Sequence, residues 1–447
     1  MDVLILSRIQ FAFTIAFHYI FPPMSIGLSI ILIIMEGMYL KTKNEIYHQM
    51  TRFWVRIFGL IFALGVATGI VMEFQFGTNW ATYSRFVGDV FGSALAAEGI
   101  FAFFLESGFL AILLFGWNKV KPRTHFFSTI MVSFGAHFSA VWIVVANSWQ
   151  QTPAGHHIVG QGLEARAEMV NFWELVFNPS SMDRLAHVLC GAWQAGAFLV
   201  LSVSAYYLLK KKHIDFAQRS FKIALIIAVI SSVLQLVTGH HSALIVKKHQ
   251  PAKLAAFGAH YPEYEPASYH LIGWVDEKNE KVYGISIPGL LSFLLSGDPK
   301  KPVVGLRAFP PEDRPPVNIV FQSYHFMVII GSGLILLSLV GVFLLWKKKL
   351  FHVKWLMWVF VLSVLGPQLA NQLGWLSAEV GRQPFIVYNL LRTEEAFSKT
   401  VSAGEVLTSL VLFCIIYLML LALFIYLLNE KIQHGPMDDH VKEGHLA

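Results

Sequence analysis

Glu379 and Arg382 are the ionisable residues that follow an apolar segment at 355–373, and their types and spacing could support chemistry. A spacing of three residues allows an ion pair at the end of a membrane helix, with Gly381 and Pro384 as helix-ending residues. Ionisable groups at membrane depth are costly and normally have a partner or a function. The pair therefore either ends a helix at the membrane interface or belongs to a functional site.

Two further carboxylates, Glu98 and Glu106, lie in one apolar segment that contains no compensating base. Eight residues of regular α-helix would separate them by about 12 Å along the axis and about 80° around it. Carboxylates in such surroundings can bind and release protons, which indicates successive stations of a proton path. Ser139, in the next apolar segment, is a weaker candidate because serine commonly bonds neighbouring membrane helices.

His18, His187 and Met327 lie toward the outer ends of three different apolar segments. Each histidine could bond a neighbouring helix or bind a metal, since imidazole is the commonest metal ligand. Methionine usually only packs, but a His and a Met from different helices at one depth could hold a haem iron.

These residues leave two classes of protein open, a haem protein that delivers protons and a proton-coupled transporter. Many Phe and Trp residues, with Gly99, Gly191 and Gly331 near the candidate ligands, favour a flat macrocycle. Transporters tend to show duplicated halves and broken helices, and neither is visible in the sequence.

The composition is that of a membrane-embedded protein. Of 447 residues 55% are hydrophobic and 14% are charged, whereas a soluble chain carries about 25% charged residues. The net charge of +6 does not indicate nucleic-acid binding, because the basic residues cluster in short loops. Cys190 and Cys414 both lie within apolar segments, so we expect no disulfide framework.

We predict an all-α integral membrane protein with about nine transmembrane helices, since each span needs about 20 apolar residues. The predicted spans are 10–40, 53–76, 94–117, 126–147, 186–209, 221–243, 319–346, 355–373 and 404–428. Four loops carry the basic residues Lys41, Lys43 and Arg52; Lys119, Lys121 and Arg123; Lys210, Lys211, Lys212 and Arg219; and Lys347, Lys348, Lys349 and Lys354. By the positive-inside rule these loops are cytoplasmic, so the N-terminus is outside and the C-terminal tail at 429–447 is cytoplasmic.

The segment at 244–318 separates helices one to six (1–243) from helices seven to nine (319–428). It is rich in proline and aromatic residues and is too long for a simple connector. We favour a binding loop at the outer membrane face, with a mobile linker as the alternative.

Five stretches occur in order along the whole chain and together are highly specific. They are Leu6 to Ala12 with His18, Gly65 to Trp80, Glu98 to Ser107, Gln-Pro-Ala-Lys-Leu-Ala-Ala at 250–256, and Gly-Arg-Gln-Pro at 381–384. Together they resemble subunit I of the cytochrome bd family of quinol oxidases. The resemblance implies oxidation of membrane quinol and reduction of dioxygen to water, with two haem b and one haem d as cofactors.

The resemblance also implies roles for individual residues. His187 and Met327 match the axial ligands of the low-spin haem b. Glu379 matches the carboxylate ligand of one high-spin haem. His18, with Glu98 nearby, matches the ligation site of the other high-spin haem. Many members hold haem d at the His18-type site, and related enzymes exchange the two high-spin haems.

Further matches concern protons, quinol and electron transfer. Glu106 and Ser139 match positions proposed in proton delivery, and Lys253 matches a lysine of the quinol loop. Trp375 matches an aromatic residue between haems. Arg382 is expected to balance charge near Glu379 or a haem propionate by bidentate pairing.

The sequence departs from the family pattern at two positions. Gly258 stands where members usually carry Glu, and Glu263 or Glu265 could substitute for it. Phe385 replaces a Trp, a mild change between large aromatic residues. The loop resembles the short quinol-loop type.

The resemblance implies a bacterial cytoplasmic membrane enzyme that takes protons from the cytoplasm and releases quinol protons outside, without pumping. Its expected partners are a second membrane subunit of similar size and a small single-helix subunit. A dihaem quinol dehydrogenase, which would need His187 and Met327 but not both high-spin sites, stays open beside the transporter.

Overall fold

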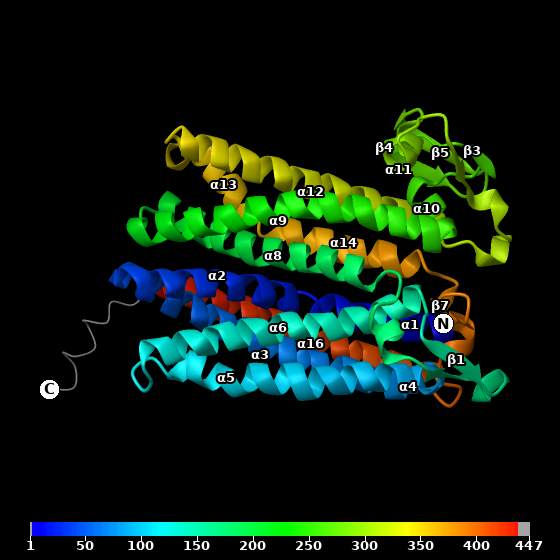
Figure 1. The fold of residues 1–447 in the computed structure, drawn as a ribbon, viewed down its shortest axis with the longest axis horizontal. Helices are drawn as coiled ribbons and strands as arrows, with labels where there is room; N and C mark the ends of the chain where they lie inside the picture. The colour runs from blue at the N-terminus through cyan, green and yellow to red at the C-terminus, as the bar shows by residue number, and fades with distance from the viewer. Residues whose placement is uncertain (1, 437–447) are drawn as a thin grey trace.

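The computed structural model describes residues 2–436, and within them nine helical spans are long and apolar enough to cross a membrane. The prediction of a nine-span all-α membrane protein is confirmed. Uninterrupted helices form six of the spans: α3 (Glu45–Thr78), α6 (Pro122–Gln151), α8 (Ser181–Leu209), α9 (Ile214–His249), α12 (Val317–Trp346) and α16 (Ala403–His434). Figure 1 shows them side by side in one bundle.

The other three spans contain an irregularity. The first is α1 (Val3–His18) followed by α2 (Phe21–Thr42), and the eighth is α13 (Lys354–Leu362) followed by α14 (Leu365–Val380). The third runs from α4 (Ala81–Ala97) through a π-helical turn, η1 (Glu98–Phe103), into α5 (Phe104–Phe115). Broken helices are therefore present, although the sequence showed no sign of them.

Several predicted boundaries were wrong because these helices extend beyond the apolar residues. The third span begins at Ala81, so most of the residues between the predicted spans 53–76 and 94–117 are helical. The eighth span continues through α14 to Val380 and includes Glu379, whereas the sequence analysis placed Glu379 after the end of that span. Helix α16 continues to His434, and the remaining tail histidines, His440 and His445, lie outside the described residues.

The main hydrophobic core joins the spans of both halves of the chain. Its buried side chains come from α2, α3, α8, α9, α13 and α16 and include Trp54, Phe198, Phe221 and Phe360. Close helix crossings depend on glycine: Gly27 of α2 and Gly196 of α8 meet backbone to backbone, so an added Cβ on either would lie within 2.3 Å of the other helix. This close packing fixes the positions of the helices that carry the site.

The segment between α9 and α12 is folded. It contains α10 (Pro251–Gly258), α11 (Leu290–Ser296), and two antiparallel pairs, β3 (Tyr264–Pro266) with β6 (Pro302–Val304) and β4 (Tyr269–Asp276) with β5 (Lys281–Ile287). Its own core includes Leu254, Leu291 and Leu306 and packs on Phe321 of α12. The segment therefore has regular elements and a hydrophobic core of its own.

The remaining short elements lie at the same end of the bundle (Figure 1). They are β1 (His156–Val159) paired with β2 (Arg166–Met169), α7 (Phe172–Val176), β7 (Phe385–Val387) paired with β8 (Leu391–Arg392), and α15 (Thr393–Ala396). The basic connections that follow α2, α5, α8 and α12 lie at the opposite end (Figure 1). The four basic connections therefore share one end of the bundle.

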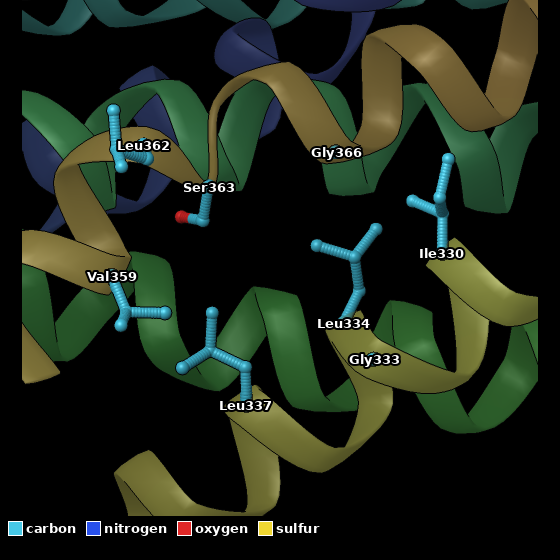
Figure 2. Close-up of a pocket in the computed structure, with 8 residues that line it drawn as sticks. All are labelled: Ile330, Gly333, Leu334, Leu337, Val359, Leu362, Ser363 and Gly366. Atoms are coloured by element: carbon cyan, nitrogen blue, oxygen red, sulfur yellow. The ribbon is translucent and has the colours of Figure 1, made fainter.

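An apolar cavity of about 340 Å³ adjoins the break between α13 and α14. Figure 2 shows Leu334 and Leu337 of α12 facing Val359, Ser363 and Gly366 across it. No ionisable side chain lines this cavity among the described residues, so it is not a centre of acid–base chemistry.

Candidate functional site

Glu379 lies in the last turn of α14 at the centre of a polar cluster. Its Oε1 accepts hydrogen bonds from Asn147 Nδ2 at 3.0 Å and Gln151 Nε2 at 3.1 Å, both from the end of α6. Its Oε2 accepts from Arg382 Nη2 at 2.5 Å. The predicted pairing of Glu379 with Arg382 is thus present, but through one nitrogen, because the other terminal nitrogen, Nη1, donates to Gln150 at 3.1 Å.

A second arginine approaches the same carboxylate. Arg184 of α8 places Nη2 4.0 Å from Glu379 Oε1 and donates to Asn147 Oδ1 at 2.5 Å. The Nε atoms of Arg184 and Arg382 are buried without a hydrogen-bond partner among the described residues. Two guanidinium groups thus lie next to one carboxylate, and each has an Nε–H donor that is not used in a hydrogen bond within the described residues. The cluster fits an additional anionic group, such as a carboxylate of a bound cofactor.

Lys253 brings the folded loop onto this cluster. The side chain is 2% exposed, and its Nζ donates to Gln151 Oε1 and, at 2.8 Å, to Gln250 Oε1. Burial, together with the positive charges of Arg184 and Arg382, holds the pKa of Lys253 well below its usual range, although Glu379 opposes this shift. A buried lysine with a lowered pKa can accept a proton from a substrate near neutral pH.

Trp375 lies one turn before Glu379 on α14. Its ring makes an edge contact with Tyr19 at 5.4 Å between centroids, and the Arg184 guanidinium lies 5.7 Å from its centroid. Trp375 therefore joins the arginine cluster to the first span.

His187 and Met327 both lie beside glycines. His187 Nδ1 is 3.0 Å from Thr238 Oγ1, and Nε2 is 2.9 Å from Gln235 Nε2, both on α9. An added Cβ on Gly239 would lie 3.3 Å from the His187 ring, and one on Gly374 of α14 would lie 2.9 Å from Met327 Sδ.

His18, at the end of α1, likewise lies next to a threonine and a glycine of another helix. Its Nδ1 is 3.0 Å from Thr68 Oγ1 on α3. An added Cβ on Gly69 would lie 3.2 Å from the ring. His187, Met327 and His18 thus each pack closely against a glycine of another helix, where a larger residue would collide with the side chain.

Glu98 and Glu106 both face α6. Ser139 Oγ donates to Glu98 Oε1 at 2.5 Å, and an added Cβ on Gly135 would lie 2.9 Å from Glu106 Cβ. Ser139 and Gly135 are four residues apart and share one face of α6. The predicted 80° between the carboxylates was wrong, because the π-turn that begins at Glu98 adds about one residue to the helix. This addition rotates the later residues by about 100° and leaves the two carboxylates about 20° apart.

Other predicted residues are not brought together. His18 bonds Thr68 while Glu98 bonds Ser139, and within residues 2–436 no hydrogen bond or ion pair joins His18 to Glu98. Glu263 is exposed whereas Lys253 is buried, and their side chains do not meet.

Sequence reasoning missed most of the partners of Glu379. Arg184 stands three residues before His187, and Asn147, Gln150 and Gln151 end α6, but nothing in the sequence indicates that they converge. A polar Asn-Ser-Trp-Gln-Gln run at the end of an apolar helix was the available signal.

The fold and this site define a multi-pass membrane protein with a buried arginine–carboxylate cluster at one end of its bundle. A model described as "Cytochrome bd terminal oxidase subunit I" matches residues 6–436, and the chain belongs to this family. It is a subunit of a quinol:oxygen oxidoreductase.

Known relatives align with this chain over nearly its full length. The chain is 40% identical to the cytochrome bd ubiquinol oxidase subunit 1 of Bacillus subtilis, covering 98% of this chain and 96% of the relative. It is 35% identical to the cytochrome bd-II ubiquinol oxidase subunit 1 of Escherichia coli, covering 97% of each. The bd oxidase structure from Geobacillus thermodenitrificans matches with a TM-score of 0.91 at 29% identity, covering 97% of this chain and 99% of that one.

Proposed function

We propose that this chain is the subunit that carries two haem b and one haem d, oxidises membrane quinol and reduces dioxygen to water. The observation that carries the proposal is the cluster of Glu379 with Arg184 and Arg382, which has unpartnered buried donors and is joined by hydrogen bonds to Lys253 of the loop. A structural ion pair alone needs neither the second arginine nor a buried lysine.

His187 and Met327 would hold the low-spin haem b. Glu379 would bind the iron of one high-spin haem, and His18, with Glu98 as a possible second ligand, the iron of the other. Haem d would occupy one of these two high-spin sites. When bound, the haems supply one-electron transfer and the site of oxygen reduction. Around them, Arg184 and Arg382 would bind propionates, and Trp375 would pack between haems.

Quinol would bind beside the loop at 244–318, where Lys253 would accept a proton from a quinol hydroxyl. The nearby amides, Gln151 and Gln250, orient the Lys253 amine by accepting its N–H groups. Glu263 is retained as a candidate for a second proton acceptor, although it does not meet Lys253 in this structure. At Gly258 a glutamate would have to displace Leu291, whose Cδ2 lies 2.9 Å from an added Cβ.

Protons for water would pass along Glu106, Ser139 and Glu98. Uptake from the cytoplasm and release of quinol protons outside would separate charge without pumping. This proposal places the strand-bearing end of the bundle outside and the basic loops inside.

The assembled enzyme would lie in the bacterial cytoplasmic membrane with a second membrane subunit of similar size. A small single-helix subunit is a further proposed partner. Apolar side chains along the outer faces of α12 and α16, including Leu336, Phe343, Leu418 and Met419, are exposed and would be covered by lipid or by these subunits.

The test is the dithionite-reduced minus air-oxidised absorption spectrum of the purified protein. We expect a b-type band with a red-shifted chlorin band, and carbon monoxide should shift only the signals of the open irons. A single b-type signal would favour a dihaem quinol dehydrogenase. No haem signal from folded protein would refute the proposal and favour a proton-coupled transporter.

A further inference from the structure

Glu36 and His125 form a buried pair away from the site described above. Glu36 of α2 is 3% exposed and His125 of α6 is 2% exposed. His125 Nδ1 lies 2.7 Å from Glu36 Oε1, and His125 Nε2 lies 3.2 Å from the carbonyl oxygen of Leu113 in α5. Thr129 Oγ1 donates to Glu36 Oε2 at 2.5 Å.

This bonding pattern fixes the number of protons in the pair. A backbone carbonyl only accepts, so His125 Nε2 must carry a proton to bond Leu113. The contact between Nδ1 and the carboxylate then needs one more proton, which either atom can carry. The pair therefore holds one more proton than a carboxylate next to a neutral imidazole would. It is either a carboxylic acid next to a neutral imidazole or a carboxylate next to an imidazolium.

A second buried histidine on the same helix shows the contrasting case. His137 Nδ1 is 2.7 Å from the carbonyl oxygen of Ser133, and its Nε2 is 3.0 Å from Trp193 Nε1. One partner only accepts and the other only donates, so His137 is a neutral imidazole with a fixed tautomer. It has no proton to share.

The pair lies on the face of α6 that leads to the proposed proton residues. His125, Ser128, Val132, Gly135 and Ser139 follow the three- and four-residue spacing of one helix face. Along this face His125 bonds α5, Gly135 opposes Glu106, and Ser139 bonds Glu98. On α5, Leu113 is seven residues from Glu106, or about 10 Å.

Charged residues lie on the other side of the pair, toward the basic loops. The Trp117 ring lies 3.9 Å from His125 between centroids, and Arg52 and His48 of α3 lie 5.7 Å and 5.3 Å from that ring. Glu45 approaches His48, and Lys119, Lys121 and Arg123 follow in the connection to α6 and its first turn. The pair thus stands between the charged end of the bundle and Glu106.

We infer that Glu36 and His125 form a proton-loading site that holds one proton and passes it toward Glu106 for oxygen reduction. The transfer moves only a proton: the pair loses one to the path and regains one from the basic end of the bundle. This inference rests on the proposed function, since Glu106 belongs to the proposed proton path.

The test compares Glu36→Gln with wild type in the assembled, haem-loaded oxidase. The amide can still bond His125 and Thr129, so packing is kept while the shared proton is lost. We expect quinol-driven oxygen consumption to fall roughly ten-fold at about pH 9 and less than about two-fold at about pH 6, because a lost proton donor limits turnover most when protons are scarce. Anaerobic reduction of the haems by quinol should stay unchanged.

His125→Gln provides a second route to the same result, and His137→Gln is the matched control with wild-type behaviour expected at both pH values. The inference is overturned if Glu36→Gln keeps the wild-type pH profile, or if its turnover falls equally at all pH values. It is also overturned if both pair variants lose assembled oxidase while His137→Gln does not, because the pair would then be structural. A wild-type enzyme without quinol oxidation would instead refute the proposed function.

Discussion

Replacement of Glu379 by Gln tests the centre of the arginine cluster. The carboxylate accepts bonds from Asn147, Gln151 and Arg382. A glutamine keeps the size of the side chain but has a single acceptor oxygen, and its NH₂ group must face at least one of these donors. Arg382, 5% exposed, would lose its charged partner.

The expected loss of folding stability follows from the burial of the ion pair. Removing one partner of a fully buried ion pair costs about 3–5 kcal/mol. The Glu379 side chain is 33% exposed, so solvent screening reduces this cost to about 2 kcal/mol. That loss corresponds to about a 30-fold decrease in the ratio of folded to unfolded protein.

The assay uses the reaction of Cys190 with a maleimide during denaturation, in a Cys414→Ala background. Cys190 is 4% exposed and should react only when α8 unfolds. The control is Glu394→Gln, which changes an exposed carboxylate and should shift stability by less than about 0.5 kcal/mol. Equal stability of both variants would refute the reasoning, as would a gain in stability in Glu379→Gln.

Met327→Leu should abolish the low-spin haem b signal while the protein still assembles, and an unchanged difference spectrum would remove Met327 as a ligand. Glu98→Gln should impair oxygen reduction more than quinol-to-haem electron transfer, as stopped-flow kinetics can separate; equal loss of both would contradict its place near oxygen. Lys253→Ala should raise the apparent KM for quinol by up to about ten-fold, since a hydrogen bond between uncharged groups contributes about 0.5–1.5 kcal/mol. Because its pKa is lowered by folding, Lys253 binds fewer protons when folded, so its contribution to stability rises with pH up to the ordinary lysine range. Denaturation from about pH 7 to about pH 10 should show this rise in wild type and lose it in Lys253→Ala.

Much of the fold was predictable because membrane spans depend on local composition. Long apolar segments separated by basic loops predicted nine spans, and these are the spans observed. The breaks were not predictable in the same way. The sequence around Glu98 is compatible with a regular helix, and the π-turn there packs against α6, a contact between distant segments. The folded loop likewise packs against α12, which is distant from most of it in sequence.

The site was predictable only where its residues are close in sequence. The three-residue spacing of Glu379 and Arg382 was enough to predict their contact. The convergence of Arg184, Asn147 and Gln151 on the same carboxylate joins segments that are far apart in the chain. The pairing of Glu36 with His125 across α2 and α6 was missed for the same reason.

Gln151 bonds the loop through one end of its amide and Glu379 through the other. Its Oε1 accepts from Lys253 and Gln250, while its Nε2 donates to Glu379. In the proposed function, a quinol that draws the Lys253 amine away from Gln151 would change the polarisation of this amide and thereby the electron density on the Glu379 carboxylate. If quinol binds at Lys253 and a haem iron at Glu379, as proposed, thermodynamic linkage requires the coupling to be reciprocal: the oxidation state of the iron would alter quinol affinity by the same factor by which quinol alters the redox equilibrium of the iron.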